Sequence, residues 1–360
     1  MSSILFTGFP GFLGSELLPR ILAREPEARA VCLVQPRYMA RAHARLAELE
    51  LGWPEIEGRT RLREGDITEP DLGLGPAEDL RRETTRVFHL AAAYDLGMTR
   101  ELGNAVNVAG TRHVVDFAAG CPGLERVHYV STCYVSGGHV GIFREEDLDR
   151  GQRFNNAYEE TKFRAEVEVR ARMEAGLPAT IYRPSIVVGD SATGETQKYD
   201  GPYFVIRWLL RQPRAAALLP VVGDPARTRL NVVPRDFVVG ALLHLSSLPH
   251  ARGRTYHLAD PTPLTVAELL EVLAEATSRR LVRVRLRPGL ARRAMSRLER
   301  WTRIPAEALA YFTHPTFYAT ERTAADLADS GIEVPRFPDY ADRLVAFVRR
   351  HPEVGSGPMT

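Results

Sequence analysis

The sequence predicts an α/β fold, a doubly wound parallel sheet followed by a smaller, mostly helical C-terminal region. The prediction rests on short apolar runs that alternate with stretches of helical periodicity, and on a glycine-rich turn after the first run. Alternation of strands and helices favours a parallel sheet, because parallel strands need long crossover connections. With 360 residues, 44% of them hydrophobic, the chain can bury a substantial core.

The elements follow from these patterns in chain order. Residues 3–7 form an apolar run, and residues 12–24 carry leucine and isoleucine at helical spacing. Further strands are predicted at 30–34, 59–63, 86–90, 126–131 and 230–233. Helices are predicted at 155–173, 202–211, 236–246 and 340–350.

The turn between the first strand and the first helix has the composition of a dinucleotide-binding turn. Glycine allows the backbone to approach a pyrophosphate, and a helix N-terminus offers free N–H groups and the positive end of its dipole. The spacing differs from the G-x-G-x-x-G fingerprint, and an ordinary turn is the alternative. We expect a Rossmann-type coenzyme site at Gly8, Phe9, Pro10, Gly11, Phe12, Leu13 and Gly14.

Two further segments bear on the coenzyme. Asp66 and Ile67 follow the third strand, where a carboxylate can accept from an adenine amino group and an apolar side chain can pack on the ring. No acid follows the second strand to bond a ribose 2′-hydroxyl, whereas Arg37 and Arg41 are near enough to pair with a 2′-phosphate. We therefore predict NADPH, with NADH less favoured and Arg37 the better phosphate ligand. Ordinary surface positions for the arginines, and a cap or loop position for Asp66, are the alternatives.

The catalytic candidates are Thr132, Tyr158 and Lys162. Tyr158 and Lys162 are four residues apart in a predicted helix and share one face. A nearby cation lowers the pKa of a phenol, which suits Tyr158 for proton transfer, and Lys162 can also hold the nicotinamide ribose. Thr132, at the end of a strand, would polarise a carbonyl together with Tyr158. The chain has one other lysine, Lys198, so Lys162 is hardly incidental.

These motifs resemble those of the extended short-chain dehydrogenases/reductases over about residues 1–260. The resemblance rests on the glycine turn, Asp66-Ile67, Tyr158-x-x-x-Lys162 and three further segments: His89-Leu90-Ala91-Ala92, Asn107-x-x-Gly110-Thr111 and Ser131-Thr132. The TGFPGFLG form of the turn, Tyr94-Asp95-Leu96, Tyr158-Glu159 and the segment from Tyr182 to Asp190 are most similar to the thioester reductase and fatty acyl-CoA reductase branch.

The resemblance implies coenzyme contacts at Ala91, Ala92, Pro184 and Ser185, and substrate contacts at Tyr94 and Ser136. It implies an NADPH-dependent reductase of an acyl thioester, either fatty acyl-CoA or a carrier-bound acyl group, that forms an aldehyde or an alcohol. The alternatives are a ketone or aldehyde reductase, a sugar or steroid-type dehydrogenase, and a non-catalytic dinucleotide sensor. Gln35 departs from the family pattern, because the members that use NADPH often carry arginine at this position.

The same motifs and patterns predict how the chain divides into domains. We expect a dinucleotide-binding domain over residues 1–190, to which 229–260 return, and a substrate-binding region formed by 191–228 and 261–360. Phe204, in the apolar helix 202–211, is expected to wall an acyl-chain pocket, although an ordinary core helix is an equal alternative. Arg227 and Arg235 are candidate ligands for the phosphates of coenzyme A or phosphopantetheine.

Composition and charge exclude several classes. A net charge of +2 gives no indication of nucleic-acid binding, and the histidines show no metal-site spacing. Three cysteines do not suggest a disulfide framework. Without a signal peptide or a long apolar run, we expect a cytoplasmic protein; no oligomeric state is assigned. The arginine-rich stretch 279–303 is predicted to be a basic amphipathic helix that faces an acidic carrier protein, an anionic membrane or only water.

Overall fold

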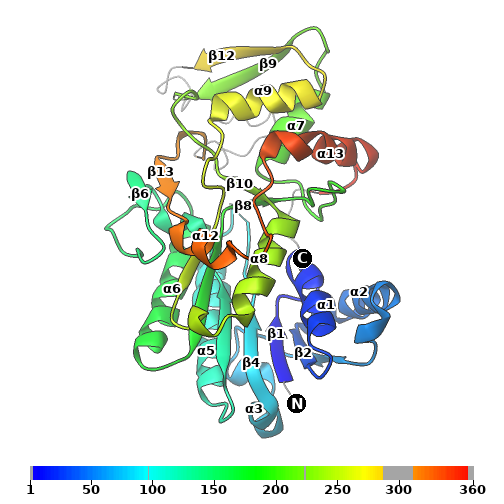
Figure 1. Ribbon diagram of the computed structural model, residues 1–360, viewed down its shortest axis with the longest axis vertical. Coiled ribbons are helices and arrows are strands. Elements are labelled where there is room, and N and C mark those ends of the chain that lie inside the picture. Colours follow the sequence, from blue (N-terminus) through cyan, green and yellow to red (C-terminus); the bar gives the residue numbers. More distant parts are fainter. Residues whose placement is uncertain (1–2, 96, 223, 287–310, 356–360) are drawn as a thin grey trace.

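A computed structural model describes residues 3–95, 97–222, 224–286 and 311–355. Its centre is a seven-stranded sheet in the order β11-β7-β5-β4-β1-β2-β3, with every adjacent pair parallel (Figure 1). The predicted doubly wound α/β fold is confirmed. The strands are β1 (Ser3–Thr7), β2 (Arg29–Val34), β3 (Thr60–Glu64), β4 (Thr84–His89), β5 (Arg126–Val130), β7 (Ala179–Pro184) and β11 (Thr255–Leu258).

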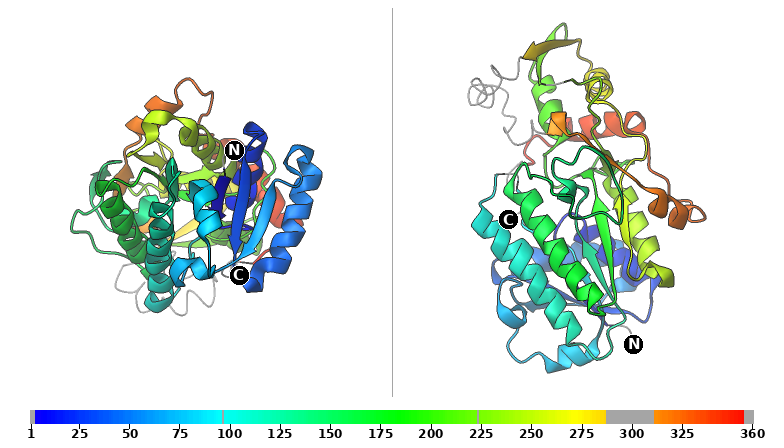
Figure 2. Two further views of the ribbon diagram at one scale, coloured as in Figure 1. Left: turned by 90° about the horizontal axis from the view of Figure 1, so that it is seen from below. Right: turned by 90° about the vertical axis from the view of Figure 1, so that its left-hand side faces the viewer.

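Helices cover both faces of the sheet (Figure 2). Successive strand residues point to opposite faces, so Ile4 and Phe6 pack in one core and Leu5 in the other. The first core is completed by α1 (Gly14–Arg24), α2 (Met39–Gly52) and α8 (Arg235–Ser247). The second is completed by α3 (Glu78–Glu83), α5 (Gly110–Ala119) and α6 (Ala157–Glu174). Burial on both faces explains why the strands read as continuous apolar runs.

The strand order places a crevice where a ligand is expected. β1 lies between β4 and β2. The chain first adds β2 and β3 on one side of β1 and then adds β4, β5, β7 and β11 on the other side, so the strand order reverses at β1. In open parallel sheets, ligands bind at such a switch point, beyond the carboxyl ends of the strands. The glycine turn follows β1 at this edge, and the loop that begins at Leu90 follows β4.

A second group of elements packs above this edge, in the upper half of Figure 1. Its apolar core is formed mainly by α7 (Pro202–Leu210), α9 (Val266–Ala276) and α13 (Phe337–Arg350). Three two-stranded sheets accompany it: β8 (Ile186–Val188) with β10 (Val232–Pro234), β9 (Ala217–Val222) with β12 (Leu281–Leu286), and β6 (Gly141–Phe143) with β13 (Thr316–Tyr318). The division of the chain at residues 190, 229 and 260 stays a prediction.

Short elements complete the connections. They are α4 (Arg100–Gly103), a π-helix at Asn104–Ala109 that runs into α5, and α12 (Glu321–Leu327). α6 begins at Ala157 because the side chain of Asn156 accepts a hydrogen bond from the Glu159 backbone N–H, which caps the helix. None of the described helices combines the length and the apolar character that crossing a bilayer requires.

The prediction of a helix over the arginine-rich stretch 279–303 is wrong for the part of that stretch that the structure describes. Leu281–Leu286 is strand β12, parallel to β9. The alternation of Val282 and Val284 with arginine has a period of two, which is the period of a strand. Arg279, just before β12, is tied to backbone carbonyls at Leu210, Gln212 and Thr277 and so has a structural role. Residues 287–303 lie outside the described part of the chain.

Candidate active site

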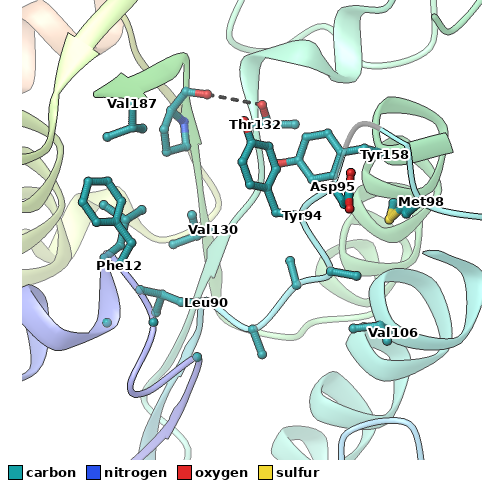
Figure 3. A pocket seen from close by; sticks show the side chains of 18 of the residues that line it. Phe12, Leu90, Tyr94, Asp95, Met98, Val106, Val130, Thr132, Tyr158 and Val187 are labelled. Atoms are coloured by element: carbon teal, nitrogen blue, oxygen red, sulfur yellow. Dashed lines mark hydrogen bonds between the residues drawn. The ribbon is translucent and has the colours of Figure 1, made fainter. Parts of the chain in front are cut away.

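A cavity of about 690 Å³ opens at the carboxyl ends of β1, β4 and β5. Its size lies in the range of cofactor and ligand sites. The glycine turn and Arg37 line one end. Figure 3 shows Phe12 of this turn on one side and Thr132 and Tyr158 on the other. The far end is apolar, with lining residues that include Phe204, Leu230, Leu269 and Phe312.

The glycine turn is compact and leaves a helix end facing the cavity. Gly8 has a φ of +91°, and a Cβ atom on it would lie 2.8 Å from the backbone nitrogen of Ala91. A Cβ atom on Gly14 would lie 2.4 Å from the Gly8 carbonyl oxygen. Both positions therefore require glycine. No side chain caps α1, so its first N–H groups and its dipole suit the pyrophosphate of a dinucleotide.

Buried hydrogen bonds hold the neighbouring loop after β4. The Thr7 hydroxyl contacts His89 Nδ1 at 2.8 Å and accepts a bond from the Ala91 N–H, while His89 Nε2 lies 3.0 Å from the Thr111 hydroxyl. Burial, and secondarily Lys162, lowers the pKa of His89 to about 3, so His89 is a neutral structural residue. Ala91 and Ala92 line the cavity beside the glycine turn.

Asn107, the first residue of the Asn107-x-x-Gly110-Thr111 motif, links two segments of the structure. It is 1% exposed, and its Oδ1 accepts a hydrogen bond from the Ala93 N–H at 2.8 Å. Its Nδ2 donates to the Thr161 hydroxyl at 3.1 Å. Asn107 therefore joins the loop after β4 to α6, the helix that carries Tyr158. A buried asparagine in a π-helix is a signal that only the structure reveals.

At the other end of the coenzyme half, three side chains form a chain of hydrogen bonds. Arg37 Nε donates to Gln35 Oε1 at 2.9 Å, and Gln35 Nε2 donates to Asp66 Oδ2 at 2.8 Å. Despite partial burial, bonds from Thr68 and Gln35 hold the pKa of Asp66 below its ordinary value. Arg37 and Ile67 line the cavity, whereas Asp66 stands behind Gln35.

Thr132 and Tyr158 lie together at the centre of the cavity (Figure 3). The Thr132 hydroxyl donates to the Pro184 carbonyl oxygen at 3.4 Å and accepts from the Tyr134 N–H at 3.2 Å. It also forms a hydrogen bond with Tyr158. Burial raises the pKa of the Tyr158 phenol, and this outweighs the opposite effect of the Thr132 bond. The phenol is therefore protonated at neutral pH, and the expectation that a nearby cation lowers its pKa is wrong.

Lys162 lies behind the cavity wall on the next turn of α6. Its Nζ donates to the Val130 carbonyl oxygen at 2.8 Å and lies 4.6 Å from the centre of the Tyr129 ring. The residue is 2% exposed, and burial lowers its pKa to about 7 while Glu166 acts in the opposite direction. Pro184 and Ser185 line the cavity nearby. The Ser185 Oγ is buried without a hydrogen-bond partner in the described structure, so it suits a ligand in the cavity.

The structure places three of the predicted substrate residues outside the cavity wall. Ser136 is fully buried, with its hydroxyl 3.2 Å from the Tyr318 hydroxyl. The Arg227 side chain is 90% exposed and pairs with Asp224. Arg235 is buried between Glu16 at 3.7 Å and the Phe12 ring at 5.2 Å. Tyr94 and Phe204 do line the cavity.

The comparison with known families agrees with this geometry. Residues 6–242 match the family described as Male sterility protein, which is more than half of the chain. The chain belongs to this family. The predictions of an extended short-chain dehydrogenase/reductase and of an oxidoreductase that uses a nicotinamide coenzyme are confirmed with it. In the described residues, no group of His, Cys, Asp and Glu side chains is arranged to hold a metal ion.

Individual relatives are longer proteins. The chain is 30% identical over 72% of its length to the nonribosomal peptide synthetase asaC of Aspergillus flavus, and spans 26% of that protein. It is 28% identical over 77% of its length to the aldehyde reductase lnbA of the same species, and spans 29% of it. Among solved structures, the terminal R domain of the myxalamid PKS-NRPS pathway has a TM-score of 0.80 at 26% identity, with 97% of this chain and 91% of that domain covered.

Proposed function

We propose that the protein is an NADPH-dependent reductase of acyl thioesters, and that its acyl group arrives on the phosphopantetheine arm of a carrier protein. The observation that carries the proposal is one continuous cavity that is lined by the glycine turn, by Thr132 and Tyr158, and by apolar side chains such as Phe204 and Leu269. A coenzyme at one end and an acyl group at the other would meet beside these two hydroxyl groups.

The coenzyme is held by the residues at the first end of the cavity. The uncapped N-terminus of α1 would receive the pyrophosphate, Arg37 the 2′-phosphate of NADPH, and Ser185 the nicotinamide half, while Lys162 lies behind that part of the wall. When bound, the reduced nicotinamide supplies a hydride to a carbonyl carbon. Gln35 bonds both Arg37 Nε and the carboxylate of Asp66, and so stands between the guanidinium and that carboxylate.

Thr132 and Tyr158 act on the carbonyl oxygen. Both hydroxyl groups can donate to it, and the negative charge that develops there is stabilised by fixed donors in a water-poor cavity. The protonated phenol of Tyr158 then gives its proton to the oxygen. The resulting hemithioacetal loses the thiol and leaves an aldehyde, so that one thioester, one NADPH and one proton give one aldehyde, one thiol and one NADP⁺.

The charges of the cavity favour a carrier-bound acyl group over acyl-CoA. Among the described lining residues the only arginines are Arg37 and Arg41, both at the coenzyme end. The phosphates of the adenosine half of coenzyme A would need cations at the substrate end, whereas a pantetheine arm is neutral apart from one phosphate at its protein-bound end. Likeness to a peptide-synthetase R domain and to the asaC synthetase supports the same choice.

The second candidate is reduction of a free aldehyde or ketone, which the likeness to an aldehyde reductase supports. The hydroxyl groups of Thr132 and Tyr158 serve both reactions, so only tests with different substrates can distinguish the two candidates. NADPH oxidation is measured with one acyl group presented on a phosphopantetheinylated carrier protein, on coenzyme A and as the free aldehyde, and products are identified by mass spectrometry. Aldehyde release from the carrier supports the proposal. Oxidation with simple carbonyls alone replaces it with the second candidate.

A further inference from the structure

The second lysine of the chain, Lys198, lies beside Tyr94, a residue of the cavity wall. Lys198 is 8% exposed, and its Nζ donates to the Tyr94 carbonyl oxygen at 3.2 Å. The same Nζ lies 4.5 Å from the centre of the Tyr94 ring and 3.6 Å from Asp200 Oδ2. Lys198 therefore contacts the backbone and the ring of a residue 104 positions earlier in the chain.

Asp200 completes this group from the other side. Its carboxylate forms a side-chain hydrogen bond with the Tyr94 hydroxyl. Its side chain is only 14% exposed, and burial raises its pKa even though Lys198 and Tyr94 act in the opposite direction. Burying a single charged group costs free energy. When a carboxylate and an ammonium are buried in contact, each charge reduces the cost of burying the other. The pair thus fixes the Tyr94 ring at two points, the hydroxyl and the ring face.

Tyr94 in turn packs on Tyr158. The two ring centres are 5.0 Å apart with an interplanar angle of 74°, an edge-to-face contact between side chains that both line the cavity (Figure 3). Edge-to-face pairs are among the preferred aromatic arrangements. The position of the Tyr158 ring therefore depends on the position of Tyr94.

We propose that Lys198 and Asp200 form a clamp that holds Tyr94 against Tyr158 and thereby positions the Tyr158 phenol for proton transfer. Lys198, Asp200 and Tyr94 are positioning residues in this proposal, which rests on the proposed function only for the role of Tyr158 as proton donor. The clamp joins the loop after β4 to the segment before α7.

The test uses the full chain and whichever carbonyl compound the wild type reduces. Lys198→Met keeps the aliphatic stem but removes the charge, and Tyr94→Phe removes only the hydroxyl that bonds Asp200. Asp326→Asn is the matched control: Asp326 is also largely buried and bonds a tyrosine hydroxyl and an arginine, but it does not line the cavity. Because a small displacement of a reacting group slows catalysis strongly, Lys198→Met should lower kcat by ~10-fold to 10²-fold. Tyr94→Phe should lower it less.

Two measurements separate positioning from a general loss of structure. The KM for NADPH should stay within about twofold of the wild type, and the solvent deuterium isotope effect on kcat should rise because proton transfer becomes slower. Lys198→Arg should restore part of kcat, and Asp326→Asn should leave both quantities unchanged.

An unchanged kcat in Lys198→Met overturns the clamp, and so does a lower kcat with an unchanged isotope effect, which indicates only a smaller folded fraction. If Lys198→Met does not fold, Tyr94→Phe decides by the same isotope measurement. A wild type that reduces aldehydes but no thioester overturns the proposed substrate and leaves this test intact, since Tyr158 serves both reactions.

Discussion

At the scale of the residue, the Tyr158 hydroxyl is the most direct test of the proposed chemistry. Tyr158→Phe should lower kcat by ~10²–10⁴, the usual contribution of a positioned acid. The dissociation constant of NADPH should change little, because the glycine turn and Arg37 remain. Steady-state kinetics and a fluorescence titration measure the two quantities. Tyr256→Phe, which removes a buried phenol oxygen remote from the cavity, should keep wild-type kcat.

Lys162 gives a prediction for stability. Burial lowers its pKa from 10.5 in the unfolded chain to about 7 in the folded protein. Between these values the unfolded chain binds the additional proton, so the Lys162 contribution to the free energy of unfolding increases as pH rises through this window. Below it both states are protonated, and the folded state bears the full free-energy cost of the buried charge.

The test compares denaturant unfolding of the wild type and Lys162→Met, without coenzyme, at pH values below and inside the window. The stability advantage of the methionine variant should be largest below the window and should shrink as pH rises. The difference between the two proteins cancels the titration of cysteines and tyrosines that both share. A difference that does not vary with pH contradicts the assigned pKa.

At the scale of the element, the loop after β2 should decide between the two coenzymes. Arg37 lines the cavity and is oriented by Gln35. Because a guanidinium–phosphate pair is a strong charge-assisted contact, Arg37→Ala should weaken NADPH binding by ~10-fold or more and leave NADH binding nearly unchanged. Arg24→Ala, an exposed arginine that bonds Leu243 and Ser247, is the control. Equal or tighter binding of NADH by the wild type would sink the NADPH assignment.

The same scale shows what a sequence can predict. β1, α1 and the strands β2 to β5 were predictable from short apolar runs and helical spacing, whereas β7 and β11 of the same sheet were not predicted. β12 was misread, since arginines that alternate with valines also fit a helical face over a longer window. β6 and β13 are three-residue strands whose pairing joins segments about 170 residues apart, and no local pattern specifies such pairing.

The residues of the candidate site also differ in how far the sequence predicts them. Thr132, Tyr158 and the glycine turn lie in one cavity because chain order in this fold fixes which strand ends meet. The charge of Arg235 and its place in the family resemblance suggested a phosphate ligand, but Glu16 and Phe12 surround it in the folded chain. Lys198 was visible as a rare residue, yet its contact with Tyr94 depends on packing between distant segments.

At the scale of the whole molecule, the position of Arg227 bears on how the thioester is delivered. Since its side chain is exposed and outside the cavity, Arg227→Ala should leave kcat/KM for both carrier-bound and CoA-bound acyl groups within about twofold of the wild type, the range expected when a surface charge without a ligand is removed. The measurement is the initial rate of NADPH oxidation with each donor. A large loss with the CoA donor alone would show that Arg227 binds a phosphate.

The apolar end of the cavity should set the acyl chain length. Each methylene group buried there strengthens transition-state binding by ~0.8 kcal/mol, about a fourfold gain in kcat/KM, until the space is filled. A series of acyl groups of increasing length should therefore show kcat/KM rising and then reaching a plateau. Because Phe204 lines this end, Phe204→Ala should move the plateau to longer chains and lower kcat/KM for short ones.

Phe317→Ala is the matched control, since Phe317 is 43% exposed and does not line the cavity; its plateau should coincide with that of the wild type. If chain length has no effect on kcat/KM in the wild type, the acyl group does not bind at the apolar end. The carbonyl would then have to reach Thr132 and Tyr158 with its chain directed to solvent, and Phe204 would be a packing residue of α7. The length series therefore distinguishes a cavity that selects its substrate by size from one that only contains the coenzyme.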